Sequence, residues 1–390
     1  MRRLVGLVVA AVIVAACGGG PILANPPLEY PSPVTPTTPP EAPNDPIPVE
    51  LPRDDGPHAR LTEWWYYTGH LENEIGRRFG FEAVVFRAER GSVPPSWAAH
   101  LALTDEGGRQ FTYAQRSEIG LQVDHSPRDS AGIPTGFDLH VSGLSPELIA
   151  GGAANFGAPW RLAGSGGADV IQAVLTDEEA AAADRSFGLD LALTSTKPAA
   201  LHGGIGFVDF GPAGSSYYYS RTRLDASGEL TLDGETYAVT GIAWFDHQWG
   251  DFISVGGGWD WFAINLEDGT DLTLSVVHDA SGEPVLGYGT LVDADGTARH
   301  LGADAFDVRS LGSWTSPVSG HTYPVHWNIL IPDEALVIEL RPTITDQELD
   351  TRATTGVAYW EGSQIVRASR LDQPLGGEAY VEVTRYDGVR

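Results

Sequence analysis

The sequence predicts an all-β protein built from antiparallel hairpins, and three kinds of observation support this class. Apolar residues alternate with small or polar ones in short runs, as at Phe187, Leu189, Leu191 and Leu193. This period of two places the apolar side chains on one face of a strand. Asp-Gly and Ser-Gly pairs separate the runs, and such pairs are typical of tight hairpin turns. Only residues 177–186 have a helical pattern, and that segment is short.

The same alternation recurs in the second half of the chain, at residues 272–276, 337–340 and 380–383. The turn pairs that accompany the runs are Asp233-Gly234, Asp268-Gly269, Ser281-Gly282, Asp295-Gly296 and Asp387-Gly388. Short strands that turn back this often are typical of β-barrels and β-sandwiches.

The first residues predict export and attachment of a lipid. Arg2 and Arg3 precede an apolar run over residues 4–14, which is too short to cross a bilayer, since that needs ~20 apolar residues. The run ends in small residues before Cys17, the single cysteine of the chain. A lipoprotein signal peptidase cuts at such a site, so we expect Cys17 to be lipidated. An ordinary signal peptide that contains a cysteine is the alternative.

We therefore predict a signal peptide over residues 1–17 and an exported protein anchored to the cell membrane or outer membrane. Its body would lie in the periplasm or on the outer surface. Several acyl chains would anchor it stably, because each buried CH₂ contributes ~0.8 kcal/mol.

Composition limits the classes of partner. The net charge is -28 and Lys197 is the single lysine, which argues against nucleic acid, because binding to phosphates needs positive charge. Residues 18–57 hold 13 of the 27 prolines. Proline fixes φ and lacks an N–H donor, so we predict an extended tether over this range.

A faint internal repeat predicts two related β-domains. The segment that begins at Trp64 can be laid over the segment that begins at Trp259, with aromatic residues, leucine and an acid at matching offsets. We expect the domains to divide within residues 225–245, as 58–235 and 236–390.

Several motifs together resemble the AttH/CrtC lipocalin-like family, which includes the carotenoid 1,2-hydratases (hydroxyneurosporene synthases). They span about residues 58 to 388 and occur in the family's order. They are Glu63-Trp64-Trp65-Tyr66-Tyr67-Thr68-Gly69-His70-Leu71, Ala99-His100-Leu101, His202-Gly203-Gly204, Ser216-Tyr217-Tyr218-Tyr219-Ser220, Trp244-Phe245-Asp246-His247-Gln248-Trp249-Gly250, Gly258-Trp259-Asp260-Trp261-Phe262, Tyr323-Pro324-Val325-His326-Trp327, Tyr359-Trp360-Glu361-Gly362 and Ala379-Tyr380-Val381-Glu382-Val383-Thr384.

The resemblance implies two tandem lipocalin-like domains that face each other around a space for an apolar ligand. It also implies two functions. The hydratase members add water to an isoprenoid C=C bond, whereas the AttH branch is linked to transport components.

Hydration of an isolated alkene needs a strong acid, a way to stabilise a carbocation, and water. A buried carboxylic acid can supply the proton, and aromatic faces stabilise the cation. Asp246 is the candidate acid, and His247 or Tyr219 is the candidate group that handles water. Trp244 shares one face of an extended strand with Asp246, while His247 lies on the other. The candidate ligand-binding residues are Trp65, Trp244, Trp249, Trp259 and Trp261.

Structural roles compete with these assignments. Asp246 can be a hydrogen-bonded acid of the core, and most tryptophans of an all-β protein simply pack. Gln248 stands where relatives often carry glutamate, which weakens any mechanism with paired acids at 246 and 248. Glu63 and Glu361 each adjoin tryptophan. Each is either a functional acid with a raised pKa or an acceptor of an indole N–H bond, and we prefer the second. Glu82 and Arg87 are expected to pair with each other or with solvent.

No metal and no cofactor are expected. The eleven histidines include no His-Glu-x-x-His pattern, and the glycine-rich stretches do not separate a strand from a helix as a dinucleotide site requires. Two hypotheses remain. We prefer a membrane-anchored protein that binds an apolar isoprenoid or lipid, in support of a transporter. The alternative is a cofactor-free hydro-lyase that acts through Asp246.

Overall fold

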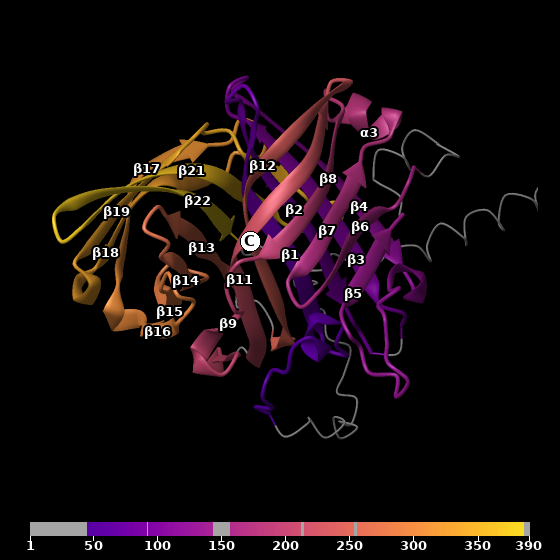
Figure 1. Cartoon of the computed structure of the whole chain (residues 1–390), viewed down its shortest axis with the longest axis horizontal. Helices are drawn as coiled ribbons and strands as arrows, with labels where there is room; N and C mark the ends of the chain where they lie inside the picture. The colour runs from indigo at the N-terminus through magenta and orange to yellow at the C-terminus, as the bar shows by residue number, and fades with distance from the viewer. Residues whose placement is uncertain (1–44, 92, 143–156, 212–213, 253–255, 386–390) are drawn as a thin grey trace, which may run out of the picture.

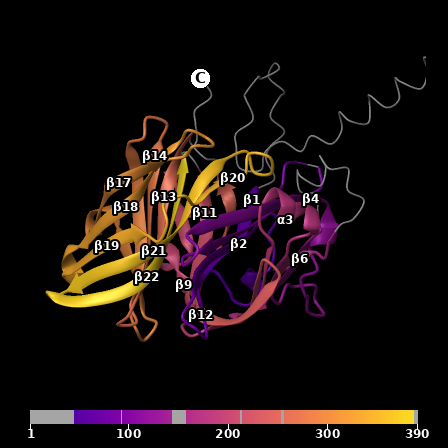
Figure 2. The ribbon, with the colours of Figure 1, turned by 90° about the horizontal axis from the view of Figure 1, so that it is seen from above.

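The protein consists of two curled antiparallel sheets that lie side by side, as Figures 1 and 2 show from two directions. The computed structural model describes residues 45–91, 93–142, 157–211, 214–252 and 256–385. One sheet is a nearly closed barrel and the other a half-barrel, so the predicted all-β class is confirmed. Within the described residues, no helix has the length and apolar character needed to cross a membrane.

The first sheet is formed by twelve of the described strands. They are β1 (Thr62–Asn73), β2 (Arg78–Ala88), β3 (Ser96–Asp105), β4 (Gln110–Ile119), β5 (Phe137–Val141), β6 (Trp160–Ser165), β7 (Ala168–Val174), β8 (Phe187–Ser195), β9 (Ala200–Leu201), β10 (Phe207–Asp209), β11 (Gly214–Leu232) and β12 (Glu235–Phe252). Their order is β4-β3-β2-β1-β12-β11-β8-β7-β6-β5, with β9 and β10 paired to β11.

The second sheet is formed by the remaining described strands. They are β13 (Gly256–Leu266), β14 (Asp271–Asp279), β15 (Pro284–Val292), β16 (Ala298–Gly302), β17 (Asp307–Thr315), β18 (Thr322–Ile331), β19 (Leu336–Pro342), β20 (Glu348–Asp350), β21 (Ala358–Arg370) and β22 (Gln373–Arg385). Their order is β16-β15-β14-β13-β22-β21-β19-β18-β17, with β20 paired to β21.

The helical segments are short. The helix α3 (Asp177–Ala182) falls in the segment predicted to be helical, and Thr176 and Glu179 form a capping box at its start. Single 3₁₀ turns are η2 (Arg53–Asp55), η3 (Leu121–Val123), η4 (His202–Gly204), η6 (Ala303–Ala305) and η7 (Pro332–Glu334).

The predicted turn pairs mark hairpins. Asp233 and Gly234 join β11 to β12 with φ of 52° and 82°, as a turn with two positive φ angles requires. The pairs at 268–269, 281–282 and 295–296 lie in longer loops between successive strands of the second sheet, and there only the glycine has a positive φ. Asp387-Gly388 lies outside the described residues.

The two sheets repeat one topology. In each, four consecutive strands form a meander whose first strand pairs with the sheet's last strand: β1 with β12, and β13 with β22. Tyr66 of β1 is opposite Asp246, and Trp261 of β13 is opposite Glu382. The predicted overlay of Trp64 on Trp259 also places Tyr66 over Trp261. Asp246 and Glu382 therefore occupy equivalent positions in the two sheets.

The strand alternation separates two environments. Trp65 and Tyr67 of β1 point into the core of the barrel, whereas Tyr66 packs in a smaller cluster with Trp261 and Tyr380 of the second sheet. Successive side chains of a strand point to opposite faces, so one strand serves both environments. The outer face of β1 and its neighbours is thus buried against the second sheet.

Two predicted boundaries differ from the structure. Residues 45–57, assigned to the tether, pack against the barrel: Asp55 is fully buried and accepts a hydrogen bond from Tyr219, and the Ile47 amide donates to Tyr217. The predicted division at residues 235 and 236 comes before β12, yet β12 pairs with β1 and β11 of the first sheet. Cys17 and residues 18–44 lie outside the described residues.

A buried ion pair helps to close the barrel. Arg116 of β4 donates two hydrogen bonds to Glu179 of α3, at 2.7 and 2.8 Å, and a third to the carbonyl of Val141 in β5. Because β4 and β5 are the two ends of the sheet, Arg116 bridges the gap between them. Its guanidinium also lies over the ring of Trp160, 4.3 Å from the centroid.

Replacing Arg116 by leucine should lower the free energy of unfolding by about 3–5 kcal/mol, because Glu179 is left as a buried charge without its partner. Urea titration followed by tryptophan fluorescence measures this. The double variant Arg116→Leu/Glu179→Leu should recover part of the loss. A cost below about 1 kcal/mol, as for a surface pair, would show that the bridge does not stabilise the barrel.

Candidate functional site

The face where the two sheets meet carries the candidate site. Carboxyl groups, tyrosines and tryptophans from both sheets gather there; we name this set the interface cluster, and it comprises Tyr66, Glu82, Tyr218, Asp246, Trp261, Tyr359, Glu361 and Glu382. All of these except Glu382 are buried, and Glu382 is half-buried. The Tyr66 and Trp261 rings meet edge to face with centroids 5.2 Å apart.

Asp246 accepts hydrogen bonds on both of its oxygens. The Trp244 indole donates to Oδ1 at 2.6 Å, Ser220 donates to the same oxygen, and Tyr218 donates to Oδ2. Burial raises the pKa of Asp246 to about 6, although these hydrogen bonds oppose the rise. Three donors favour the ionised, acceptor-only form of a carboxyl group. The geometry therefore suits Asp246 as an orienting acceptor better than as a proton donor.

Glu361 and Glu82, unlike Asp246, have surroundings that favour the protonated form of the carboxyl group. Tyr66 donates to Oε1 of Glu361 at 2.6 Å, and Tyr359 donates to Oε1 of Glu82 at 2.8 Å. The Oε2 atom of each glutamate is buried and has no hydrogen-bond partner within the described part of the chain. An ionised carboxylate left in this state would be costly, so each group favours its neutral form.

The pKa shifts agree with this geometry. Burial raises the pKa of Glu82 to about 8, and burial together with the charges of Glu82 and Glu382 raises that of Glu361 well above its usual range. Burial also raises the pKa of Glu382 to about 7, against hydrogen bonds from Thr384 and Trp259. Burial and the unpartnered oxygens therefore favour the protonated forms of Glu82 and Glu361 near neutral pH.

Two buried histidines continue the hydrogen-bond network of the interface cluster. His100 contacts the Tyr359 hydroxyl through Nδ1 at 2.7 Å, and His202 contacts Ser220 through Nε2 at 2.7 Å. Burial lowers the pKa of each histidine to about 3. A neutral imidazole can donate at one nitrogen and accept at the other, so each can pass a proton along its chain.

The structure brings only part of the predicted site together. Trp244 and Asp246 share one face of β12, and His247 and Trp249 share the other, as the alternation predicts. Trp259 and Trp261 lie on the Asp246 side, whereas Trp65 and Trp249 lie in the barrel core.

The predicted water-handling groups lie away from Asp246. His247 and Tyr219 face the barrel interior, where His247 contacts Glu63 and Tyr219 donates to Asp55. The hydroxyl groups that do contact Asp246 are those of Tyr218 and Ser220. Adjacent residues of β11 point to opposite faces of the sheet, so Tyr218 faces Asp246 whereas Tyr219 faces the barrel interior.

Other expectations are corrected by the contacts. Glu63 contacts the imidazole rings of His58 and His247, and the indole of Trp360 donates to Thr345 O, so the predicted indole bonds to Glu63 and Glu361 are wrong. Glu82 bonds to Tyr359, and Arg87 bonds to Glu89, so the predicted Glu82–Arg87 pair is wrong. Gln248 lies on the Asp246 face and donates to Ser216.

Partly exposed aromatic rings border the interface cluster. Trp64, Phe86 and Trp259 pack against its apolar part, and Trp64 also meets Phe252 edge to face at 5.7 Å. A cavity of about 10 Å³ lies beside Trp244 and Tyr380, which is room for about one water molecule. A larger cavity, of about 570 Å³, lies between β4, α3 and residues 344–350.

Comparison with known proteins places this architecture in a family. The AttH-like family matches residues 42–386. This chain belongs to the AttH-like family. A solved structure described as AttH, from Nitrosomonas europaea, is 30% identical with a TM-score of 0.70, over 88% of this chain and 98% of that one. A search of curated proteins found no match.

A second solved structure shares the fold. Kievitone hydratase from Nectria haematococca has a TM-score of 0.63 and 16% identity, over 87% of this AttH-like chain and 93% of that one. At 16% sequence identity, this similarity is evidence for a shared fold alone. The predicted family resemblance is therefore confirmed for AttH and for the architecture of the two sheets.

The raised pKa of Glu82 predicts a pH-dependent stability. A carboxyl group with a raised pKa binds its proton more tightly in the folded state, so the free energy of unfolding falls as pH rises from 4.5 towards about 8. Between pH 5 and pH 8.5, Glu82→Gln should reduce this fall by on the order of 2 kcal/mol.

Urea titrations at the two pH values measure the difference. The exposed Glu74→Gln, in the turn after β1, is the control and should change the fall by little. An equal fall in wild type and Glu82→Gln would mean that Glu82 ionises in the folded state as it does in water.

Proposed function

We propose that the interface cluster is an acid-catalysis site that adds water to a C=C bond of an apolar substrate. The observation that carries the proposal is the pair of buried glutamates, Glu82 and Glu361, each with an oxygen that has no hydrogen-bond partner among the described residues and each with a raised pKa. A carboxylic acid whose proton has no acceptor in the protein can give that proton to a substrate.

Glu361 is the proposed proton donor. Tyr66 donates to its Oε1, which leaves the acid proton on the unpartnered Oε2. Transfer of this proton to one alkene carbon forms a C–H bond and leaves a cation on the other carbon. The new carboxylate and the faces of Tyr66 and Trp261 would stabilise that cation. Water then forms the C–O bond and returns a proton to the carboxylate, so Glu361 is restored.

Asp246 is assigned a supporting role in this scheme. It holds Tyr218, which in turn accepts a hydrogen bond from the Trp261 indole at 3.0 Å. Asp246 therefore orients an aromatic ring that borders the reacting centre. The fold it shares with a protein named kievitone hydratase supports hydration as the reaction class.

A carrier is the second candidate, and the partly exposed rings of Trp64, Phe86 and Trp259 favour it. Exposed aromatic surface can bind an isoprenoid or lipid without any chemistry. In this case the neutral glutamates would serve to bury the interface without charge, and the protein would hold an apolar molecule in support of a transporter.

Turnover assays separate the candidates. The full chain in detergent is incubated with neurosporene or with kievitone, and the product mass is measured. A gain of one water supports the enzyme, and Glu361→Gln should reduce the rate about 10²–10⁴-fold, the usual contribution of a general acid. Tyr66→Phe should reduce it less, because the acid remains.

The exposed Glu74→Gln is the matched control and should leave the rate unchanged. Recovery of bound but unchanged probe from wild type and Glu361→Gln alike would favour the carrier. Failure to bind either probe would contradict both proposals for these ligands. A rate that falls in Asp246→Asn but not in Glu361→Gln would return the acid role to Asp246.

We also propose that the protein is anchored through Cys17, which would keep it near membrane-dissolved substrates. Cys17→Ala should abolish incorporation of a palmitate label and move the protein from the detergent phase to the aqueous phase of a Triton X-114 separation. Retention of the variant in the detergent phase would contradict anchoring through this residue.

A further inference from the structure

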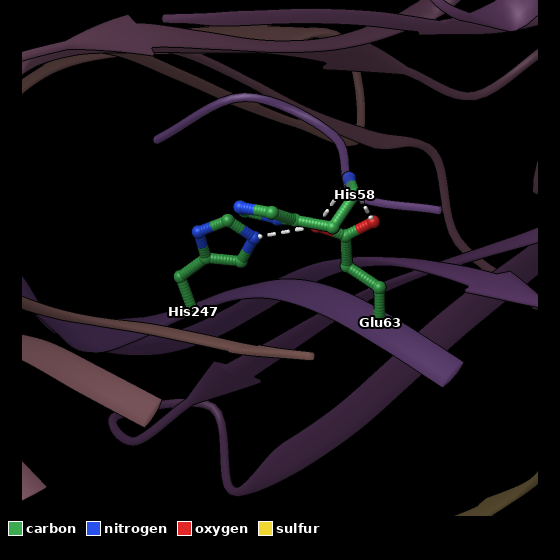
Figure 3. A group of neighbouring side chains, drawn as sticks. All are labelled: His58, Glu63 and His247. Atoms are coloured by element: carbon green, nitrogen blue, oxygen red, sulfur yellow. Dashed lines mark hydrogen bonds and ion pairs between the residues drawn. The ribbon is translucent and has the colours of Figure 1, made fainter. Parts of the chain in front are cut away.

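A second polar group lies in the barrel, on the opposite face of the first sheet from the interface cluster. His58, Glu63 and His247 come from the segment before β1, from β1 and from β12, and their side chains converge (Figure 3). Glu63 Oε1 lies 2.7 Å from Nδ1 of His58 and 3.0 Å from Nε2 of His247. One carboxylate oxygen thus faces two imidazole nitrogens at once.

The spacing of these atoms is close to that of a metal site. One ligand atom from each residue lies within 4.8 Å of the other two. Around a tetrahedral Zn²⁺ with bonds of about 2.1 Å, ligand atoms are about 3.4 Å apart. Small side-chain rotations are therefore enough to admit an ion. Two imidazole nitrogens and one carboxylate oxygen are ligands that Zn²⁺ prefers.

The surroundings fix the two imidazole rings. His58 stacks on Trp249 with centroids 4.0 Å apart, and His247 stacks on Trp65 at 4.7 Å. Nε2 of His58 lies 3.5 Å from Asp54, a carboxylate placed as outer-shell partners of metal-bound histidines are. Restricted rings reduce the entropy lost when an ion binds.

Hydrogen bonding alone leaves His247 incompletely satisfied. Its Nδ1 is buried and has no partner among the described residues. The Glu63 carboxylate, 3.0 Å from Nε2, accepts the proton of a neutral His247 at that nitrogen when no ion is bound. An ion at Nε2 would replace that hydrogen bond and move the proton to Nδ1, where no described group accepts it. The ion would therefore gain its affinity from the three ligands and not from completing the hydrogen bonds of His247.

The local charges permit an ion. Arg87 lies 3.7 Å from Glu63 Oε2 and opposes a cation, whereas Asp54 and Asp55 are buried nearby and favour one. Arg53 pairs with Asp54 and Arg221 pairs with Asp55, which reduces that benefit. The nitrogen and oxygen ligands themselves therefore supply most of the affinity.

We propose that His58, Glu63 and His247 bind one divalent transition-metal ion of the Zn²⁺ class, with a coordination position left open. The ion would fasten residues 45–58 to the barrel, because His58 belongs to that segment and the other two ligands belong to β1 and β12. The His58 side chain is 20% exposed, whereas those of Glu63 and His247 are fully buried, so the ion would enter past His58.

Cobalt binding tests the proposal. The full chain in detergent is stripped with a chelator and titrated with Co²⁺, whose visible absorption reports nitrogen and oxygen ligands at low coordination number. We expect one Co²⁺ per chain, displaced by Zn²⁺. A hundredfold excess of Zn²⁺ over Kd should raise Tm by about 5 °C, and Mg²⁺ should not.

Variants assign the site. His58→Asn and Glu63→Gln should weaken Co²⁺ binding at least tenfold, while His326→Asn, which removes a half-buried histidine paired with Glu339, should leave it unchanged. His58→Asn changes the most exposed ligand, so the test stands even if a buried variant fails to fold. Absence of a Co²⁺ band, or equal binding by His58→Asn and wild type, would overturn the proposal. The three side chains would then form a hydrogen-bonded group that holds residues 45–58 against the barrel.

Discussion

The burial of carboxyl groups between two β-sheets is the constraint on which the rest of this structure depends. Glu82, Asp246 and Glu361 are almost wholly removed from water, at 1%, 3% and 1% exposure. Such groups are tolerated only when they are hydrogen-bonded or neutral. The interface uses both solutions: Asp246 is surrounded by donors, and the raised pKa values of the two glutamates favour their neutral forms. The same requirement places a hydroxyl of Tyr66, Tyr218 or Tyr359 on each of these carboxyl groups.

The strand β12 connects the two polar regions of the protein. Asp246 and His247 are neighbours in sequence, yet one faces the second sheet and the other the barrel core. The repeated topology gives Asp246 a counterpart in Glu382 of β22, so the interface is built from equivalent strands of both sheets. The barrel side has its own group, His58, Glu63 and His247. The same overlay places Gly258 and Val383 at the positions of Glu63 and His247, so the second sheet does not repeat this group.

Local pattern predicted the strands better than the site. The Asp-Gly turns, the alternation at residues 187–193 and the opposite faces of Asp246 and His247 all follow from neighbouring residues, and the structure agrees with them. The assignment of Tyr219 failed because the face that the other sheet covers is a property of the assembled chain. Glu82 looked like an ordinary strand acid, since its partner Tyr359 is 277 residues away.

The sequence by itself determined the β class, the hairpins, the internal repeat and the family, because each is recorded in short-range spacing or in motifs that occur in order. The tertiary structure alone decided which acids are neutral and which histidines converge. A pKa depends on burial and on partners, and His247 meets Glu63 across 184 residues. Those contacts exist only once β12 lies beside β1 and the second sheet covers their outer face.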